Sequence, residues 1–528
     1  MQPPEHVAAR TRSEQFIHLR PAAYTTVLAV LLCVPVLSNA QNSAIANASR
    51  SASGLKFSLG GEVTFTDNIG LRSSNETAGS IWRVTPGLSW NHQSSHLTSH
   101  VGLGWSFTTT SPSNGSDTSQ LTLDSNLQGA FLDRDLLIDV TGRIANQDSS
   151  PFSIPTPAGG SGYNNQVQTR YFSVSPSYRN HLGGWDYQVG YRLSNSSASN
   201  SALTTSTSQG VNANINNGRS SPILVTSLLA NSQRYETSNR PSYSITTTQL
   251  REDWHVNNQL SLFASGGNEY DGYLLQNSNN AIYDAGFSWL PGPRTSLSVT
   301  AGHRYYGESH SISLSHRTRR TVWQFSSSKS AVHSQDQFAA LELVTTAEFL
   351  ARIPDSADRA RIEALLRTLN GGVLPAVVGA QLAAVLSDSE ILSEKQNLSV
   401  TWLGVNNTVI FSAFRGTSSQ ISNNLITASF SGTSTLSLGN EIKQRGYSLL
   451  WSYKLSAQSS ANLAYTNTLS EAAQTGLETD AKTLSLGYER RLSAKTSVGG
   501  SVRHFKSTSS ANNDVTENAV TAHIRTEF

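Results

Sequence analysis

The sequence is poor in cysteine, methionine and charge, and each shortage excludes a class of protein. Its one cysteine is Cys33, which excludes a disulfide framework in the rest of the chain. Its one methionine is Met1. Charged residues make up only 14% and the net charge is +2, which excludes a strongly basic nucleic-acid surface. No nucleic-acid partner is therefore expected. Abundant Ser, Thr, Asn and Gly instead suit polar walls and loops.

The N-terminus has the pattern of a secretory signal. Basic residues precede an apolar run over residues 22–37, and small residues lead to a cleavage site after Ala40. We expect residues 1–40 to be a signal peptide and 41–53 a short linker; an uncleaved helix is the alternative. No later stretch is long and apolar enough for a membrane helix, so a chain that spans a membrane must do so as a closed barrel.

The strongest signal is an alternation of apolar and polar residues. It fills the last nine residues, 520–528, and the terminal Phe528 resembles the assembly signal of bacterial outer-membrane barrels. The same alternation recurs over residues 55–65, 447–455 and 484–488. A period of two makes one face of a strand apolar and the other polar, so the polar faces would line a lumen.

The connections between these segments alternate between short and long. Short turns fall near residues 91–95, 132–134, 181–184, 256–258, 291–293 and 493–495, with longer Ser/Asn/Gly-rich stretches between them. This phase is typical of an outer-membrane barrel, and a soluble β-sandwich has no reason to keep it. The count gives about 22 strands, within a range of roughly 18 to 24. Residues 416–444 form either one long loop or a further hairpin.

One region, residues 332–393, changes to a helical spacing. One of its segments places several apolar residues on a single helical face, namely Ile362, Leu365, Leu366 and Leu369. Residues 375–386 are apolar on nearly every side and too few to cross a bilayer, so we expect them to be buried. The insert would enter the lumen as a plug, cap the extracellular mouth or contact a partner. Barrel strands are expected in residues 54–331 and 394–528.

Two groups of side chains are candidates for a specific role. Beside the predicted short turns lie Trp90, Trp185, Trp254, Trp289 and Trp402, which we expect to form an aromatic girdle at the periplasmic interface; ordinary core tryptophans are the alternative. The second group is basic and comprises Arg294, Arg304, Arg317, Arg319 and Arg320. Guanidinium groups in a lumen or at a rim suit an anionic or hydroxyl-rich polymer. The alternative is a solvated turn with arginines packed on lumen carboxylates.

Catalytic and metal-binding patterns are missing. His92, His96 and His100 recur every fourth residue, but residues four apart on a strand are about 13 Å apart. The sequence has no G-x-S-x-G elbow, H-E-x-x-H or phosphate-binding glycine loop. We therefore predict no catalytic residues, no metal site and no cofactor.

Several segments resemble the PEP-CTERM system-associated outer-membrane proteins, a family found with exosortase and exopolysaccharide loci. The resemblance rests on Thr66-Asp67-Asn68-Ile69, Val84-Thr85-Pro86-Gly87-Leu88, Phe131-Leu132-Asp133-Arg134, Trp289-Leu290-Pro291-Gly292-Pro293-Arg294-Thr295, His303-Arg304-Tyr305-Tyr306-Gly307 and Ser315-His316-Arg317-Thr318-Arg319-Arg320-Thr321. It implies an outer-membrane barrel that moves or displays exopolysaccharide or exosortase-sorted surface proteins. It supplies no catalytic residues.

The sequence thus predicts an all-β, antiparallel up-and-down outer-membrane barrel with a small helical insert, reaching the outer membrane of a Gram-negative cell through its signal peptide. The expected function is a porin-like conduit for exopolysaccharide or surface-protein export. The alternatives are a structural or adhesive barrel with a blocked lumen and, less favoured, a barrel hydrolase acting on lipid or polysaccharide. Expected partners are outer-membrane lipids, the outer-membrane assembly machinery and the exported polymer or protein. A TonB-dependent transporter is disfavoured because only residues 41–53 precede the first strand, too few for a folded plug domain.

Overall fold

The computed structural model describes residues 54–112, 117–148, 150–157, 160, 166–199, 205–237, 240–272, 278–333, 350, 359, 362–363, 365–366, 390–421, 441–510 and 514–528. The expected signal peptide and linker lie outside these residues.

The described residues form 22 strands and one short 3-10 helix. The first half consists of β1 (Gly54–Thr66), β2 (Gly79–Gln93), β3 (Leu97–Ser111), β4 (Thr118–Phe131), η1 (Leu132–Arg134), β5 (Leu136–Asp148), β6 (Gln166–Leu182), β7 (Trp185–Ala198), β8 (Ser206–Asn216), β9 (Leu224–Thr237), β10 (Arg240–Asn257) and β11 (Leu260–Asp271). The second half consists of β12 (Ser278–Gly292), β13 (Thr295–Arg304), β14 (Gly307–Arg317), β15 (Thr321–Val332), β16 (Ile391–Leu403), β17 (Asn407–Gln420), β18 (Glu441–Lys454), β19 (Ser459–Ala472), β20 (Glu478–Arg491), β21 (Thr496–Ser509) and β22 (Val515–Glu527).

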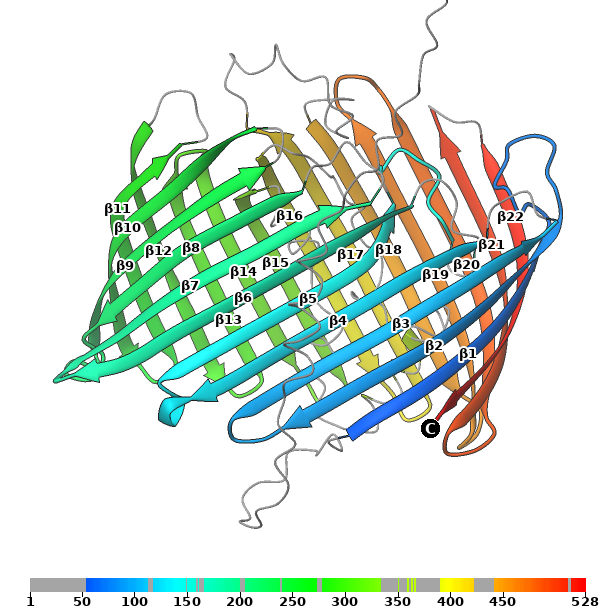
Figure 1. Ribbon diagram of the computed structural model, residues 1–528, viewed down its shortest axis with the longest axis horizontal. Coiled ribbons are helices and arrows are strands. Elements are labelled where there is room, and N and C mark those ends of the chain that lie inside the picture. Colours follow the sequence, from blue (N-terminus) through cyan, green and yellow to red (C-terminus); the bar gives the residue numbers. More distant parts are fainter. Residues whose placement is uncertain are drawn as a thin grey trace, which may run out of the picture. The chain divides into compact units, whose positions relative to one another are not determined.

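Each strand pairs antiparallel with the next one along the chain, and β22 pairs with β1, so the sheet closes into a barrel (Figure 1). The closing pair runs in register from Ser58 opposite Glu527 to Thr66 opposite Ala519. Closure leaves no open sheet edge, which is the condition under which strands can cross hydrocarbon. The prediction of an up-and-down barrel with about 22 strands is confirmed. Because β17 pairs directly with β18, no hairpin enters the sheet between them.

Side chains alternate between the two faces of the barrel wall. On β1 the apolar Leu55, Phe57 and Phe65 are all more than half exposed, whereas Thr64 and Thr66 are buried. The Thr64 hydroxyl lies 2.9 Å from that of Thr521 on β22, on the inner side of the seam. The outer face is therefore apolar and the inner face polar, as a barrel surrounded by lipid requires.

Short and long connections alternate around the barrel. Short turns join β2 to β3, β4 to β5 and β6 to β7 on the rim where the chain ends, the last of these with Gly183 at a positive φ of +59°. The opposite rim carries the long connections, so it is extracellular and the short-turn rim periplasmic. Two extracellular connections are short: two residues separate β9 from β10, and β13 and β14 are joined by Tyr305 and Tyr306, followed by Gly307 at a φ of +100°.

The insert between β15 and β16 leaves and returns at the extracellular rim. Val332 pairs with Ile391, so β16 begins three residues before the boundary expected from the sequence. Within the insert the structure describes a few helical residues, which are Leu350, Arg359, Ile362, Glu363, Leu365 and Leu366. Leu369 and residues 375–386 lie outside the described part. None of the helices in the described part is both long and apolar enough to cross a membrane.

Candidate functional site

The helical residues of the insert lie against the inner wall of the barrel. Ile362, Leu365 and Leu366 are at most 2% exposed and form a cluster with inner-wall residues of β17, β18 and β19, namely Ile410, Leu450 and Ala464. These wall residues lie near the periplasmic ends of their strands, and the periplasmic Leu403 packs on the same cluster. The insert is attached at the extracellular rim, so it extends down the lumen to reach them.

The inner wall beneath the insert is covered along much of its length. On β18 every second residue from Ile442 to Ser452 is buried, while the alternate residues face outward and are exposed. On β17 every second residue from Thr408 to Gly416 is also buried, and the alternate residues are exposed or half-buried. Several buried polar side chains here have no hydrogen-bond partner in the described structure, among them Thr401, Thr408, Ser412 and Asn462. Burying such groups without a partner costs about 1–3 kcal/mol each, so this wall is only partly matched to what covers it.

The opposite wall is exposed on part of its inner face, although the inward-facing Ser194 and Ser196 of β7 and Ser206 and Ser208 of β8 are buried nearer the extracellular rim. On β4 the inward-facing Asp124, Asn126 and Gln128 are all exposed, as are Arg192 on β7 and Asn212 on β8. Charged, amide and hydroxyl groups of this kind can hydrogen-bond water or a hydroxyl-rich solute. The lumen is thus asymmetric, with a covered wall on β17 and β18 and a water-accessible polar wall on β4, β7 and β8.

The connection between β5 and β6 closes part of the extracellular mouth. Phe152 is 4% exposed and packs into a cluster of apolar residues on the far wall, which are Val332, Ile391, Ile442 and Ala472, with Leu477 beside them. The Thr479 hydroxyl donates a 3.1 Å hydrogen bond to the Phe152 carbonyl. Further along, Ile154 packs beside Phe505 and Val515, and Arg83 donates a 2.7 Å hydrogen bond to the Gly160 carbonyl.

The length of chain shows how close the two walls are at this rim. Phe152 lies four residues beyond Asp148, the end of β5, a span of at most roughly 14 Å. It nevertheless belongs to one cluster with residues of β15, β16, β18 and β19, which are far from β5 in the order of strands. At this rim the end of β5 and the cluster on the far wall are therefore no farther apart than this short segment and the Phe152 side chain can span.

A second set of contacts lies at the base of the insert. His333 Nδ1 is 2.7 Å from Glu390 Oε1. His333 directly follows β15 and Glu390 directly precedes β16, so this contact joins the two ends of the insert. The Tyr305 hydroxyl also donates a hydrogen bond to Glu390. The His333 ring lies 4.3 Å from the ring of Tyr235 on β9, which is 2% exposed. These contacts hold the base of the insert against two other parts of the rim.

The expected arginine group does not form one cluster. Arg304 lies at the extracellular end of β13 and donates a 2.8 Å hydrogen bond to Asp284. This contact is of the kind expected if the arginines pack on carboxylates of the lumen. Arg294 precedes β13 at the periplasmic rim, where Arg317, Arg319 and Arg320 occupy the next turn. The ten residues of β13 separate the two positions by about 33 Å along the strand. A single polymer could therefore contact only the four arginines of the periplasmic rim together, and that contact stays a prediction.

The five tryptophans lie next to periplasmic turns. Trp185, Trp254, Trp289 and Trp402 are each at least 40% exposed, and Trp90 is half-buried beside the His92 ring. Trp323 and Trp451, near the periplasmic ends of β15 and β18, are exposed in the same way. Their role as an interfacial girdle stays a prediction, because it concerns the lipid rather than the protein.

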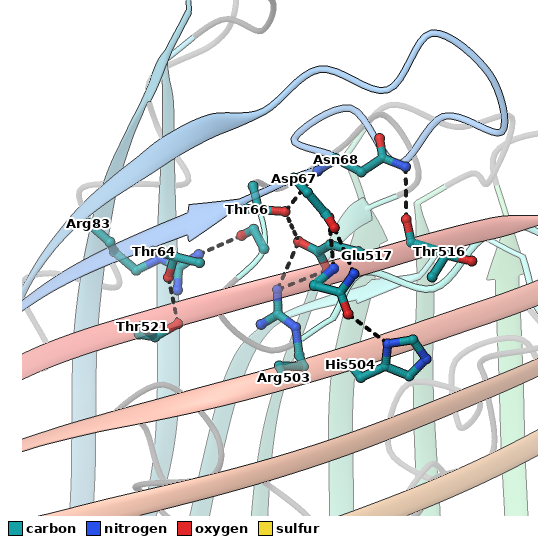
Figure 2. A network of polar contacts seen from close by, with 12 residues as sticks. Thr64, Thr66, Asp67, Asn68, Arg83, Arg503, His504, Thr516, Glu517 and Thr521 are labelled. Carbon is teal, nitrogen blue, oxygen red and sulfur yellow. Dashed lines mark hydrogen bonds and ion pairs between the residues drawn. The ribbon is translucent and has the colours of Figure 1, made fainter.

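A network of polar contacts joins the strands at the seam between β1 and β22 (Figure 2). One guanidinium nitrogen of Arg503 lies 3.0 Å from both carboxylate oxygens of Glu517, and both side chains are almost fully buried. The Thr66 hydroxyl donates a 2.8 Å hydrogen bond to Glu517. Asp67 accepts two hydrogen bonds from Asn518, one from its backbone and one from its side chain. The Thr66-Asp67-Asn68 motif therefore joins the first strand to the last.

Phe528 ends the chain beside this seam. Its backbone N–H donates a 2.8 Å hydrogen bond to the Phe57 carbonyl, and its side chain is 64% exposed. The terminal strand is therefore paired to its last residue. The role of Phe528 in assembly stays a prediction.

The three spaced histidines do not converge. His92 faces outward, His100 faces inward beside Asn91, and His96 lies in the turn between their strands. Throughout the described ranges, no group of three or more His, Cys, Asp or Glu side chains is arranged to hold a metal ion.

Sequence reasoning missed the residues that close the mouth. Phe152 and Ile154 stand out as apolar residues in a Ser/Gly/Pro-rich stretch, which is the signal that could have found them. His333 and Glu390 carry no comparable signal, because only the fold places them beside each other.

Comparison with known proteins finds no matching family model and no matching curated protein. Solved barrels do match. The siderophore receptor PirA of Pseudomonas aeruginosa is 9% identical with a TM-score of 0.44, over 91% of this chain and 81% of that one. The outer membrane protein opdK of the same organism is 9% identical with a TM-score of 0.34, over 90% and 99%. OmpT of Vibrio cholerae, as a loop L8 deletion mutant, is 9% identical with a TM-score of 0.29, over 90% and 100%.

The assignment of the fold follows from the strand pairings of the chain itself. A closed barrel of 22 antiparallel strands, apolar outside and polar inside, is an outer-membrane barrel, and the chain is localised to the outer membrane of a Gram-negative cell.

Proposed function

We propose that the protein is a gated conduit whose insert, residues 333–390, is a plug that lies along one wall of the lumen. The observation that carries this proposal is the asymmetry of the inner wall: exposed polar side chains on β4, β7 and β8 face a wall covered by the insert. A barrel of this size has room for a channel unless something fills it. Solutes would move along the polar wall when the mouth opens.

Two features support gating over permanent closure. The wall beneath the insert keeps polar groups such as Thr408 and Ser412 that find no hydrogen-bond partner in the described residues, so water reaching them when the insert moves would stabilise the open state. Among the described residues the contacts at the mouth are few, chiefly those of Phe152 and of the His333–Glu390 pair. Because few contacts have to break, the mouth can open at a modest cost in free energy.

For the exported solute we propose a hydroxyl-rich polymer, an exopolysaccharide, or a surface-sorted protein handled with it. The exposed wall offers amide, carboxylate and guanidinium groups, which hydrogen-bond sugar hydroxyls in several directions. The resemblance to PEP-CTERM system-associated proteins favours the same class.

The second candidate is a structural or adhesive barrel that never opens. It is favoured by the apolar packing of Phe152 across the mouth.

Single-channel recording separates the two candidates. The folded full chain should be nearly silent in a planar bilayer. A variant that combines Phe152→Ser with deletion of residues 334–389 should give steady openings, whereas Val405→Ser, which alters an 83% exposed side chain at a periplasmic turn, should stay silent. Addition of a soluble polysaccharide should then block the open variant. Silence of the combined variant, with its barrel still resistant to unfolding in detergent, would favour the closed structural barrel.

A further inference from the structure

A group of cations lies on the outer face of the barrel near the extracellular rim. Arg415 on β17, Arg445 on β18, Lys482 on β20 and Lys506 on β21 all belong to the outward-facing positions of their strands and are exposed. We call these four residues the basic rows. They are separate from the lumen and from the conduit proposed above.

The basic rows contain like charges placed directly opposite each other. Arg415 is the cross-strand partner of Arg445, and Lys482 is that of Lys506. Such pairs bring side chains within about 5 Å at Cβ and destabilise a sheet. In the described part of the chain no ion pair involves Arg415 or Lys506, whereas Arg445 contacts Glu471 and Lys482 contacts Asp480. An anion between the strands would relieve the repulsion in both pairs.

The height of the basic rows fits the headgroup layer of a membrane. Eight residues along β20 separate Lys482 from Arg490, which lies near the periplasmic end of the same outer face. At about 3.4 Å per residue and a tilt of about 40°, this is roughly 21 Å, close to the apolar band of about 25 Å in outer-membrane barrels. Between the two cations the outer face carries only apolar and aromatic side chains, Leu484, Leu486 and Tyr488.

Exposed cations also lie singly on the outer face near the extracellular rim elsewhere, as Arg170 on β6 and Arg234 on β9 do, but neither stands opposite another cation. At a comparable distance from the extracellular rim, β2 and β3 carry the exposed Trp82 and Trp105 instead. The carboxylates Glu441, Glu471 and Glu478 lie nearer the rim than the basic rows, so among the described residues of β18 to β20 the acidic residue at their level is Asp480. The directly opposed cations therefore lie together on this side of the barrel, and they face the outer leaflet.

We propose that the basic rows are a binding site for the phosphorylated headgroup of an outer-leaflet glycolipid, whose acyl chains lie along the apolar face below. Guanidinium and ammonium groups on neighbouring strands would bind the phosphate oxygens. Apolar packing on Leu484 and Leu486 distinguishes a lipid from a free phosphate ion as the ligand.

Native mass spectrometry of the folded full chain in detergent tests this proposal. The probes are a bis-phosphorylated glycolipid, the same glycolipid after enzymatic dephosphorylation, and inorganic phosphate. The phosphorylated lipid should bind at least about tenfold more tightly than the dephosphorylated one, and Arg415→Gln combined with Lys506→Gln should weaken its binding by a similar factor. Arg234→Gln, which removes an exposed cation from the outer face of β9, is the matched control and should leave binding unchanged.

Three results would overturn the proposal. Equal binding of the two lipids would remove the role of phosphate, and unchanged binding by the double variant would remove the role of the basic rows. Competition by inorganic phosphate at equal concentration would indicate an ion site without a lipid. The comparison of the two lipids on the unmodified chain stands even where the double variant does not fold.

Discussion

At the scale of single residues, the ion pairs of the barrel wall differ in how much they contribute to stability. Arg503 and Glu517 are almost fully buried beside the seam, whereas Lys443 and its partner Glu441 are exposed. A buried charge that loses its partner is costly, while an exposed pair contributes little because water and salt screen it. The seam therefore depends on its buried pair.

We expect Glu517→Gln to lower the free energy of unfolding by about 3 kcal/mol, because Arg503 would keep its charge in a buried site without a carboxylate. The measurement is the urea midpoint of unfolding from lipid vesicles. Lys443→Gln is the control and should cost less than about 1 kcal/mol. Equal effects of the two substitutions would show that the seam pair is hydrated and does not hold the strands together.

Tyr305 makes the stability of the folded protein at the mouth depend on pH in the alkaline range. Burial first, and then the Glu390 carboxylate, raise the pKa of its phenol above the ordinary value. An acid whose pKa is raised on folding contributes stability that is complete below its unfolded pKa of about 10 and is lost as pH rises above that value. The phenol thus stays protonated in the folded protein under conditions in which it would ionise in the unfolded chain.

Tyr305→Phe should accordingly be less stable than the unmodified chain by about 1 kcal/mol at neutral pH, since it lacks the hydrogen bond to Glu390. The difference should shrink from about pH 10 upward, because phenylalanine does not titrate. Urea midpoints of both proteins at a series of pH values provide the measurement. A difference that stays constant to pH 12 would contradict the burial of this phenol.

At the scale of elements, the insert and the barrel wall meet through a small apolar contact. Ile362, Leu365 and Leu366 supply one helical face, and Ile410 and Leu450 supply the wall. Spacing in the sequence identified that helical face, because apolar residues three and four apart lie together on a helix. The wall residues could not be assigned to it from the sequence, since inward positions of β17 and β18 are otherwise mostly polar.

We predict that Leu366→Ala weakens this contact by about 2–5 kcal/mol, the usual cost of truncating a buried leucine. The insert should then be cut by trypsin at least about tenfold faster, while the barrel itself stays folded. Leu182→Ala, at a 77% exposed position in a periplasmic turn, is the control. Unchanged cleavage in Leu366→Ala would mean that the insert is held elsewhere, for example at the His333–Glu390 pair.

At the scale of the whole molecule, the sequence predicted the barrel far better than its interior. Alternation along segments such as 520–528 determines the two faces of the wall, and the phase of short and long connections determines the parity of the strands. Both signals are local. The mouth depends on contacts such as Phe152 with Ile442 and Tyr235 with His333, which join residues far apart in sequence and leave no period behind.

The arginine group illustrates the same limit. Arg294 and Arg304 are close in sequence and both flank β13, yet the strand carries them to opposite rims. Residues close in sequence are close in space when a turn lies between them. When an extended strand lies between them, they are far apart. The basic rows on the outer face show the converse, because Arg415 and Arg445 are thirty residues apart and directly paired.

The central claim is that the lumen has one water-accessible wall and one covered wall. Its most direct test is the rate of thiol labelling of single cysteines placed on the two walls in a Cys33→Ser background, which removes the one native cysteine. Asn126→Cys on β4 and Ser448→Cys on β18 are matched, because both replace small polar residues on inward-facing positions, one exposed and the other 0% exposed. In the folded protein the account predicts rapid labelling at 126 and labelling at least about tenfold slower at 448, with equal rates in urea. Equal rates in the folded state would contradict it.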